Sequence, residues 1–248
     1  MLLENKVAII TGASRGIGRQ AAITLAKHGA SIIITGRNVD LLNEIASIVD
    51  EMGRECIICS GDVRDEETAR YVTYTAIEHF GKMDILVNNA GINMRTSTLD
   101  MSMEQWKEVI DINLHGNLLF TKAVLSYMVE QKSGKIVNVS STTAKSGHRN
   151  AIPAYGASKA GVDYLTKHLA LEMAPYNINV NGVSPGPIDT DMIKQWSSEH
   201  YERVLANIPL NRIGTPQNVA DAILFLSSSM SDFITGETIN INGGTYLN

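Results

Sequence analysis

The 248-residue sequence predicts an α/β protein in which helices cover both faces of a doubly wound parallel sheet. Short apolar runs alternate regularly with longer segments of helical pattern, and parallel strands need crossovers of this kind. The strand runs are continuously apolar rather than alternating, as expected for strands that are buried on both faces. No linker or low-complexity segment interrupts the pattern, so we expect one domain over residues 1–248.

Seven short segments have the β-branched, apolar composition of buried strands. They are residues 7–10, 32–34, 56–59, 85–87, 136–139, 178–183 and 239–241. Between them we expect helices up to about residue 28, over 40–52, 66–80 and 102–131, from about Tyr155 to 174, and over 192–206 and 217–228. Signals at the helix ends agree: the sequence offers N-terminal caps at Asp65 and at Ser102 with Gln105, and C-terminal glycines at Gly29, Gly53 and Gly81.

The composition argues against several classes of protein. The formal net charge of −5 and the lack of like-charge blocks argue against a nucleic-acid partner. No apolar run approaches the ~20 residues of a membrane span, and the polar start of the chain is unlike a signal peptide, so we expect a cytoplasmic protein without a membrane partner. Cys56 and Cys59 lie in a predicted strand and are interpreted as buried thiols, and the histidines lack metal-ligand spacing, so no metal is expected.

A glycine-rich turn, Thr11-Gly-Ala-Ser-Arg-Gly-Ile-Gly18, joins the first strand to the first helix. Glycine permits positive φ and a close approach of the backbone to a ligand. The N–H groups and dipole at the start of the helix suit a pyrophosphate. Although the spacing differs from the usual G-x-G-x-x-G, the turn predicts a dinucleotide site with the candidate residues Gly12, Ser14, Arg15, Gly16, Ile17 and Gly18.

The end of the second strand bears on which dinucleotide binds. NAD-binding proteins of this architecture carry an acidic residue near this point for the ribose 2′-hydroxyl. Here Gly36 occupies that region and Arg37 follows it. Arg15 and Arg37 could together hold a 2′-phosphate, because a guanidinium suits bidentate phosphate contacts. We therefore expect NADP (NADPH) in preference to NAD, the alternative being that both arginines are simply exposed.

Tyr155 and Lys159 are the candidate proton-transfer pair. They are four residues apart in a segment of helical pattern, so the phenol and the ammonium lie on one face. A nearby cation favours the phenolate and lowers the pKa of a phenol from its usual value near ~10. The pair is thus expected to donate and accept a proton near neutral pH, although a surface Tyr beside a solvated Lys would show the same spacing.

Four motifs in the same order make the chain similar to the short-chain dehydrogenase/reductase family over about residues 6–246. The motifs are the Thr11–Gly18 turn (TGxxxGxG), Asn88-Asn-Ala-Gly91 (NNAG), Tyr155-Gly-Ala-Ser-Lys159 (YxxxK) and Pro185-Gly186 with Thr190 (PGxxxT). The resemblance implies a Rossmann-type sheet of about seven strands, a nicotinamide cofactor and a homotetramer. The last is consistent with the apolar helices expected over 102–131 and after Tyr155, where Gly156, Ala157, Ala160 and Gly161 permit close helix approach.

The resemblance also implies catalytic roles. Tyr155 would be the general acid in carbonyl reduction, and Lys159 would lower its pKa and bind the nicotinamide ribose. Asn113 would hold a water in the proton relay, unless its amide only props a helix turn. The catalytic hydroxyl is less directly matched: the family places it thirteen residues before the Tyr, at Thr142, but an insertion would bring Ser141 there, and we expect Ser141 rather than Thr142 or Ser140.

Further cofactor contacts follow from the same resemblance. They are Asp62 and Val63 at the adenine, Asn89 and Ala90 beside the adenine ribose, Gly91 of the second motif, Tyr155 and Lys159, and the segment with Pro185, Gly186, Ile188 and Thr190 at the nicotinamide.

The substrate expected from the resemblance is a small carbonyl or alcohol compound. The chain is most similar to the 3-oxoacyl-acyl-carrier-protein reductase group, which implies fatty acid biosynthesis and acyl carrier protein as a possible partner. Sugar, polyol and steroid dehydrogenases share these motifs, and a non-enzymatic dinucleotide-binding protein is a further alternative. A substrate lid is expected over about 191–211, where Met192, Ile193, Trp196 and Tyr201 could line an apolar mouth. Lys132, Lys135, Lys145 and Arg149 are candidates for docking an acidic carrier protein.

Overall fold

The structure is a computed structural model that describes residues 1–148, 151–191, 193 and 196–247. Its strands are β1 (Val7–Thr11), β2 (Ser31–Gly36), β3 (Cys56–Ser60), β4 (Ile85–Asn88), β5 (Gly134–Val139), β6 (Ile178–Pro185) and β7 (Thr238–Ile241). All neighbours pair in parallel, in the order β3-β2-β1-β4-β5-β6-β7. The order reverses between β1 and β4, as in doubly wound sheets, so the predicted fold class is confirmed.

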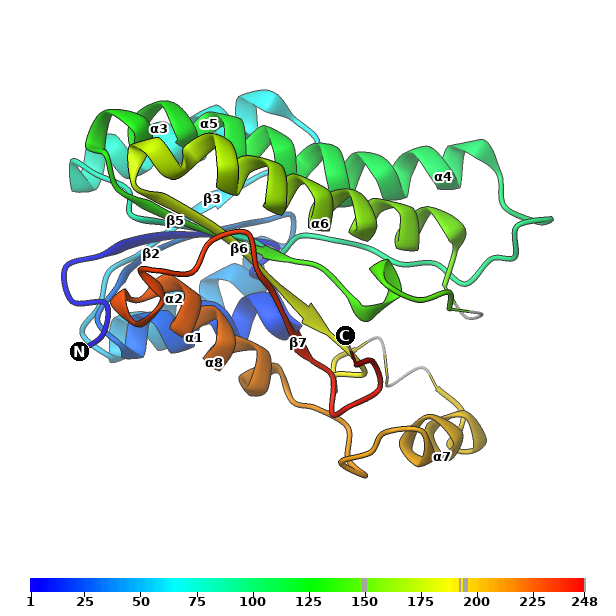
Figure 1. The fold of residues 1–248 in the computed structure, drawn as a ribbon. Helices are drawn as coiled ribbons and strands as arrows, with labels where there is room; N and C mark the ends of the chain where they lie inside the picture. The colour runs from blue at the N-terminus through cyan, green and yellow to red at the C-terminus, as the bar shows by residue number, and fades with distance from the viewer. Residues whose placement is uncertain (149–150, 192, 194–195, 248) are drawn as a thin grey trace.

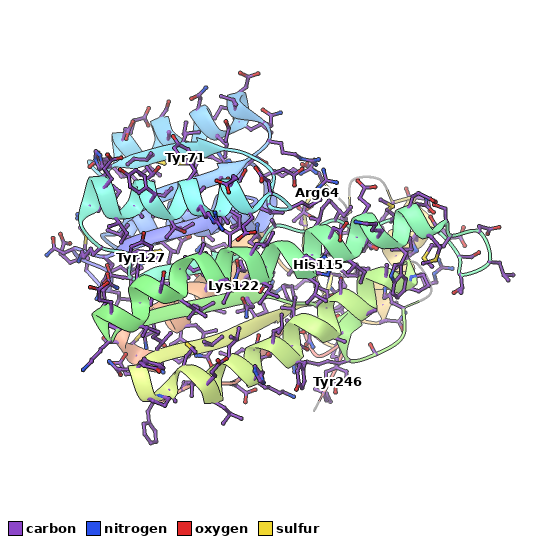
Figure 2. All side chains as sticks on the ribbon, turned by 90° about the horizontal axis from the view of Figure 1, so that it is seen from above. Arg64, Tyr71, His115, Lys122, Tyr127 and Tyr246 are labelled. Carbon is purple, nitrogen blue, oxygen red and sulfur yellow. The ribbon has the colours of Figure 1, made fainter. Side chains whose placement is uncertain are left out.

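Helices cover both faces of this sheet (Figure 1). One face carries α1 (Gly16–Lys27), α2 (Val39–Glu51) and α8 (Pro216–Ser227). The other carries α3 (Glu66–Phe80), α5 (Gly116–Gln131) and α6 (Pro153–Met173), which lie side by side in Figure 2. Two further helices are α4 (Met103–Ile110), which leads into α5, and α7 (Ser198–Ala206), which stands out beyond the end of the sheet (Figure 1).

The alternation of side chains along each strand builds two cores. In β1, Ala8 and Ile10 are fully buried in the core beneath α1, α2 and α8, whereas Val7 and Ile9 belong to the core on the opposite face. Phe120 of α5 is a fully buried residue of that second core. Burial on both sides explains why the strands are apolar without alternation.

The predicted helix ends are confirmed. The Asp65 side chain accepts a hydrogen bond from the backbone N–H of Glu67, and Ser102 and Gln105 form a reciprocal capping box. The three predicted glycines follow helix ends and have positive φ: Gly29 (108°), Gly53 (70°) and Gly81 (71°). Glycine adopts this left-handed conformation without the steric strain that a side chain would add.

Two predicted helices differ from those observed. The segment expected as one helix over 102–131 contains a π-helical turn, Asp111–His115, between α4 and α5, where the N–H of Gly116 bonds to the carbonyl oxygen of Asp111. The helix expected over 192–206 begins as α7 only at Ser198, because Ser197 caps it by accepting from the N–H of His200. Met192, at the start of that prediction, lies outside the described residues.

A ladder of buried amides ties the middle strands to the helices above them. Asn88 and Asn138 are paired across β4 and β5, and Asn88 Nδ2 donates to Asn138 Oδ1 at 3.0 Å. Asn117 of α5 donates to the same Oδ1 at 3.1 Å, and Asn138 Nδ2 donates to Thr166 Oγ1 of α6 at 2.9 Å. These bonds satisfy both polar atoms of the buried Asn138 amide, which would otherwise be costly to bury.

The two cysteines lie in a strand, as the sequence predicted. Cys56 and Cys59 both lie in β3, and burial raises the pKa of the Cys56 thiol to about 12, which keeps it protonated. Over the described residues, no cluster of His, Cys, Asp or Glu could hold a metal ion, and no helix is long and apolar enough to cross a membrane.

Candidate active site

A cavity of about 390 Å³ opens at the carboxyl ends of the strands. Its walls come from the segments that follow β1, β2, β3, β4, β5 and β6, together with α6 and residues near α7. This is the position where doubly wound sheets bind ligands, at the point where the strand order reverses. Most of the predicted site residues therefore meet in one place.

The glycine-rich turn forms one wall of the cavity. Gly12 has φ +63°, and a Cβ on it would lie 2.7 Å from Ala90 Cα, so only glycine fits there. Gly16 has φ +56°, and its position faces Thr190. The helix α1 starts here with neither a side-chain cap at Arg15 nor an acidic residue in its first turn. Its N-terminal N–H groups therefore remain suited to an anionic ligand.

Asn89 and Thr11 hold this turn against the end of β4. Asn89 Nδ2 donates to the carbonyl oxygens of Thr11 and Gly12, both at 3.0 Å. Thr11 Oγ1 accepts from the N–H groups of Asn89 at 3.0 Å and Ala90 at 3.1 Å. A Cβ on Gly18 would lie 2.4 Å from Asn89 Nδ2, so Gly18 makes room for this amide. The positioning role of Thr11 had no separate signal in the sequence.

Arg15 and Arg37 are both exposed and both line the cavity. Neither forms an ion pair with another described residue. Asp62, which lines the same end, is paired with Arg64 at 2.7 Å, and this hydrogen bond and the charges of Arg64 and Arg37 hold the pKa of the Asp62 carboxyl below its usual value. The end of β2 is Gly36. The pocket beside it therefore offers two guanidinium groups to an anion and no acidic side chain from β2.

Tyr155 and Lys159 lie on the same side of α6 and both line the cavity. Lys159 Nζ is 5.9 Å from the centroid of the Tyr155 ring. Lys159 is only 4% exposed, and its Nζ donates to the carbonyl oxygen of Val139 at 2.6 Å. The predicted arrangement of phenol and amine is therefore present, with the amine fixed against the end of β5.

The predicted lowering of the phenol pKa is not seen in this structure. Burial raises the pKa of Tyr155, and the hydrogen bond with Ser141 opposes this only in part. Burial also lowers the pKa of Lys159 from 10.5 to about 8. The spacing of the two residues reveals the neighbouring cation but not the removal of both groups from water, which disfavours their charged forms.

Ser141 is the hydroxyl that meets Tyr155. Its hydrogen bond to the phenol is accompanied by one from the N–H of Thr143, which Ser141 Oγ accepts at 3.2 Å. Ser140 Oγ instead lies 3.3 Å from the carbonyl oxygen of Lys159. Thr142 begins a short 3₁₀ helix (Thr142–Ala144). The geometry thus favours Ser141 over the two alternatives that the sequence left open.

Asn113 lies in the π-helical turn and is 1% exposed. Its Oδ1 accepts from the N–H of Ile92 at 2.8 Å, and its Nδ2 donates to the carbonyl oxygen of Ile92 at 2.9 Å and to Ser158 Oγ at 3.1 Å. These contacts fix the loop after β4 against α6. The role of Asn113 in a water relay stays a prediction.

Several lining residues were predicted and several were not. The cavity is lined by Val63, Ala90, Gly91, Pro185, Gly186, Ile188 and Thr190 as expected, and of the predicted lid by Ile193 and Trp196. Tyr201 lies instead at a separate hollow with Asp189 and Glu202. Arg95, His148 and His200 also line the cavity, but no motif marks them. Arg95 adds a positive charge here, and burial together with this charge lowers the pKa of both imidazoles, which favours their neutral forms.

The site fits the nicotinamide dinucleotide that the sequence predicts. The backbone is open at Gly12 and Gly16 and uncapped at α1, which suits a pyrophosphate. Gly91 keeps the space beside Lys159 clear, since a Cβ there would lie 3.4 Å from Nζ and 3.3 Å from Asn113 Oδ1. Lys159 Nζ would bind ribose hydroxyls, and Arg15 and Arg37 would bind phosphate.

Known proteins are similar to this chain in both sequence and fold. A family model described as enoyl-(acyl carrier protein) reductase matches residues 12–246. The 3-oxoacyl-[acyl-carrier-protein] reductase FabG of Vibrio harveyi is 38% identical over 247 residues, covering 100% of each chain. The solved 3-oxoacyl-[acyl-carrier protein] reductase of Brucella melitensis is 32% identical with a TM-score of 0.94, covering 100% of this chain and 93% of that one. A short-chain type dehydrogenase/reductase of Mycobacterium marinum is 33% identical with a TM-score of 0.95, covering 99% and 97%.

With the identity running over the full length and the same fold around the same motifs, this chain belongs to the short-chain dehydrogenase/reductase family, and it is an oxidoreductase acting on CH–OH and C=O groups.

Proposed function

We propose that this protein is an NADPH-dependent reductase of 3-oxoacyl thioesters. The observation that carries the proposal is the convergence of Ser141, Tyr155 and Lys159 on one cavity beside an uncapped helix N-terminus. The substrate class is supported by the full-length similarity to a reductase named for 3-oxoacyl-[acyl-carrier-protein].

The residues at the cavity wall provide the proton side of the reaction. When bound, a reduced nicotinamide would supply the hydride for the carbonyl carbon, so this chain's own residues provide only the proton. Tyr155 Oη donates its proton to the carbonyl oxygen as negative charge develops there, and Ser141 Oγ donates a hydrogen bond to the same oxygen. Lys159 then stabilises the phenolate that remains, until solvent returns a proton to Tyr155.

The protonation state of Tyr155 favours the reductive direction. Because burial raises the pKa of its phenol, Tyr155 is protonated at neutral pH, and a protonated phenol is the form that reduction requires. Oxidation of an alcohol requires the phenolate and should gain more from alkaline pH. We therefore propose reduction as the main direction near neutral pH.

NADPH is proposed rather than NADH because of the charges at the end of β2. Arg15 and Arg37 line the cavity without ion pairs to described residues, and Gly36 stands where an acidic side chain would select a free 2′-hydroxyl.

Two proposals concern partners. A homotetramer is supported by apolar side chains exposed on α6, where Tyr164 is 67% and Leu171 82% exposed. Gly161, however, packs on Leu114 of its own chain, which a Cβ would approach to 3.0 Å, so its small size has an internal reason.

We also propose that the protein is cytoplasmic.

Acyl carrier protein is proposed as the source of the thioester. The cations considered for its docking do not form one patch. Lys135 is the second residue of β5 and pairs with Asp232, whereas Lys145 lies beyond the other end of that strand and donates to Asn240. Arg149 lies outside the described residues. A docking surface is therefore to be sought near the cavity mouth, where Arg95 adds a cation.

The test is a spectrophotometric assay of NADPH consumption by the purified protein. Acetoacetyl thioesters should be reduced with NADPH and much more slowly with NADH, and Tyr155→Phe serves as the inactive control. Turnover confined to sugars, polyols or steroids would overturn the substrate class. Tight NADPH binding without turnover of any carbonyl compound would overturn the enzymatic proposal in favour of a dinucleotide-binding protein.

A further inference from the structure

Asp163 is a half-buried acid that the proposed mechanism does not use. It lies in α6 one helical turn after Lys159 and two turns after Tyr155, so the three side chains follow one face of the helix. Its Oδ1 is shielded from solvent and has no hydrogen-bond partner among the described residues. A carboxylate oxygen in this state is costly, and it calls for an explanation.

The groups around Asp163 connect it to the catalytic residues. The Ser140 hydroxyl bonds to the Asp163 carboxyl and also lies 3.3 Å from the carbonyl oxygen of Lys159. Burial raises the pKa of Asp163, while Ser140 and the cations Lys145, Lys167 and Lys159 lower it. These cations come both from α6 and from the segment after the 3₁₀ helix, so they favour the charged carboxylate from two sides.

Lys159 needs a counter-charge of this kind. Its ammonium is almost fully buried, and the Val139 carbonyl that it bonds to carries no charge. The charge of Asp163 raises the pKa of Lys159 against the effect of burial. Asp62, which also lines the cavity, is already paired with Arg64.

We propose that Asp163 is a positioning residue that keeps Lys159 protonated and, through Ser140, fixes the strand end that carries Ser141. The part concerning turnover rests on the proposed reductase function. The part concerning the charge of Lys159 does not, because it is a property of the protein without substrate.

The first experiment measures the charge of Lys159 directly. Protein labelled with ¹³C-lysine is titrated by NMR, and the Lys159 Cε signal is assigned by its loss in Lys159→Met. In Asp163→Asn, which keeps the shape but loses the charge, we expect the Lys159 midpoint to fall by about one pH unit. Asp163→Glu should restore most of the midpoint. Ser140→Ala, which removes the hydrogen bond and keeps the carboxylate, should move it little.

The second experiment is the pH profile of NADPH-dependent reduction. Since Lys159 would lose its proton at lower pH in Asp163→Asn, the alkaline decline of kcat should begin about one pH unit earlier, and Asp163→Glu should resemble the parent. A parent protein that reduces no thioester would refute the proposed function, yet the NMR titration would still decide the role of Asp163.

An unchanged Lys159 midpoint in folded Asp163→Asn would overturn the proposal. If Asp163→Asn does not fold, Asp163→Leu gives the same comparison without a buried polar group. Failure of both to fold while Asp163→Glu folds would also overturn it, because Asp163 would then be required for the fold itself.

Discussion

Because Lys159 is buried, we predict that replacing it by an apolar residue raises the free energy of unfolding of the protein. Lowering of its pKa from 10.5 to about 8 corresponds to about 3 kcal/mol against the charged form at neutral pH. Lys159→Met removes that cost but also the hydrogen bond to the Val139 carbonyl oxygen, which contributes about 1 kcal/mol. In this variant the Asp163 carboxylate still has the cations Lys145 and Lys167 nearby, so it is not left without a counter-charge. We therefore expect a net stabilisation of about 2 kcal/mol at pH 7, or a Tm about 4–8 °C higher.

The effect should depend on pH in a defined direction. Because the folded protein binds this proton less readily than the unfolded chain does, the cost is fully present below pH 8 and decreases as the pH rises from there toward 10.5. From these two values, the cost at pH 9 is about 2 kcal/mol, so the gap between Lys159→Met and the parent should shrink by about 1 kcal/mol between pH 7 and pH 9.

Thermal unfolding at fixed protein concentration measures both quantities. Lys122→Met is the matched control, because Lys122 is an exposed lysine of α5 that forms no ion pair with a described residue, so its loss should change the Tm little at either pH. A Lys159→Met protein that is no more stable than its parent at pH 7, or whose advantage grows toward pH 9, would refute the reasoning.

Three other substitutions test the site. Tyr155→Phe should lower kcat by at least about 100-fold while NADPH still binds, as measured by fluorescence titration; near-normal turnover would contradict its role as the acid. Gly12→Ala places a Cβ 2.7 Å from Ala90 Cα at φ +63°, so it should lower the Tm and weaken NADPH binding more than Gly53→Ala, which has φ +70° but open space. Equal losses in the two would mean that backbone strain alone matters. Arg37→Ala should raise the KM for NADPH about tenfold or more and leave that for NADH nearly unchanged, since one bidentate phosphate contact is lost. A parallel change for both cofactors would argue against a 2′-phosphate contact.

The sequence predicted the parts of the structure that local chemistry determines. Continuous apolar strands separated by helical patterns imply buried parallel strands, and β1 to β7 follow that prediction closely. The cap at Asp65 and the glycine end at Gly81 also formed as expected, because each satisfies backbone groups within its own helix.

The features that the sequence did not predict depend on tertiary contacts. The π-helical turn at Asp111–His115 leaves the helical pattern on both sides intact, so periodicity does not reveal it. Only the fold brings Thr11 to the end of β4 and Arg95 to the cavity wall. The protonation of Tyr155 follows from burial, which spacing along a helix cannot report.

The asparagines between β4 and β5 determine which of the possible strand alignments the chain adopts. The residues paired across these two strands are similar apolar side chains, such as Leu86 with Ile136 and Val87 with Val137. Hydrophobic burial alone would therefore tolerate a shifted pairing. A shift of one residue would turn Asn88 or Asn138 toward the opposite core, away from Thr121 and Thr166. The desolvation of an unsatisfied amide would then disfavour the misaligned sheet, and the residues that follow these strands at the cavity reach their positions only when the alignment is correct.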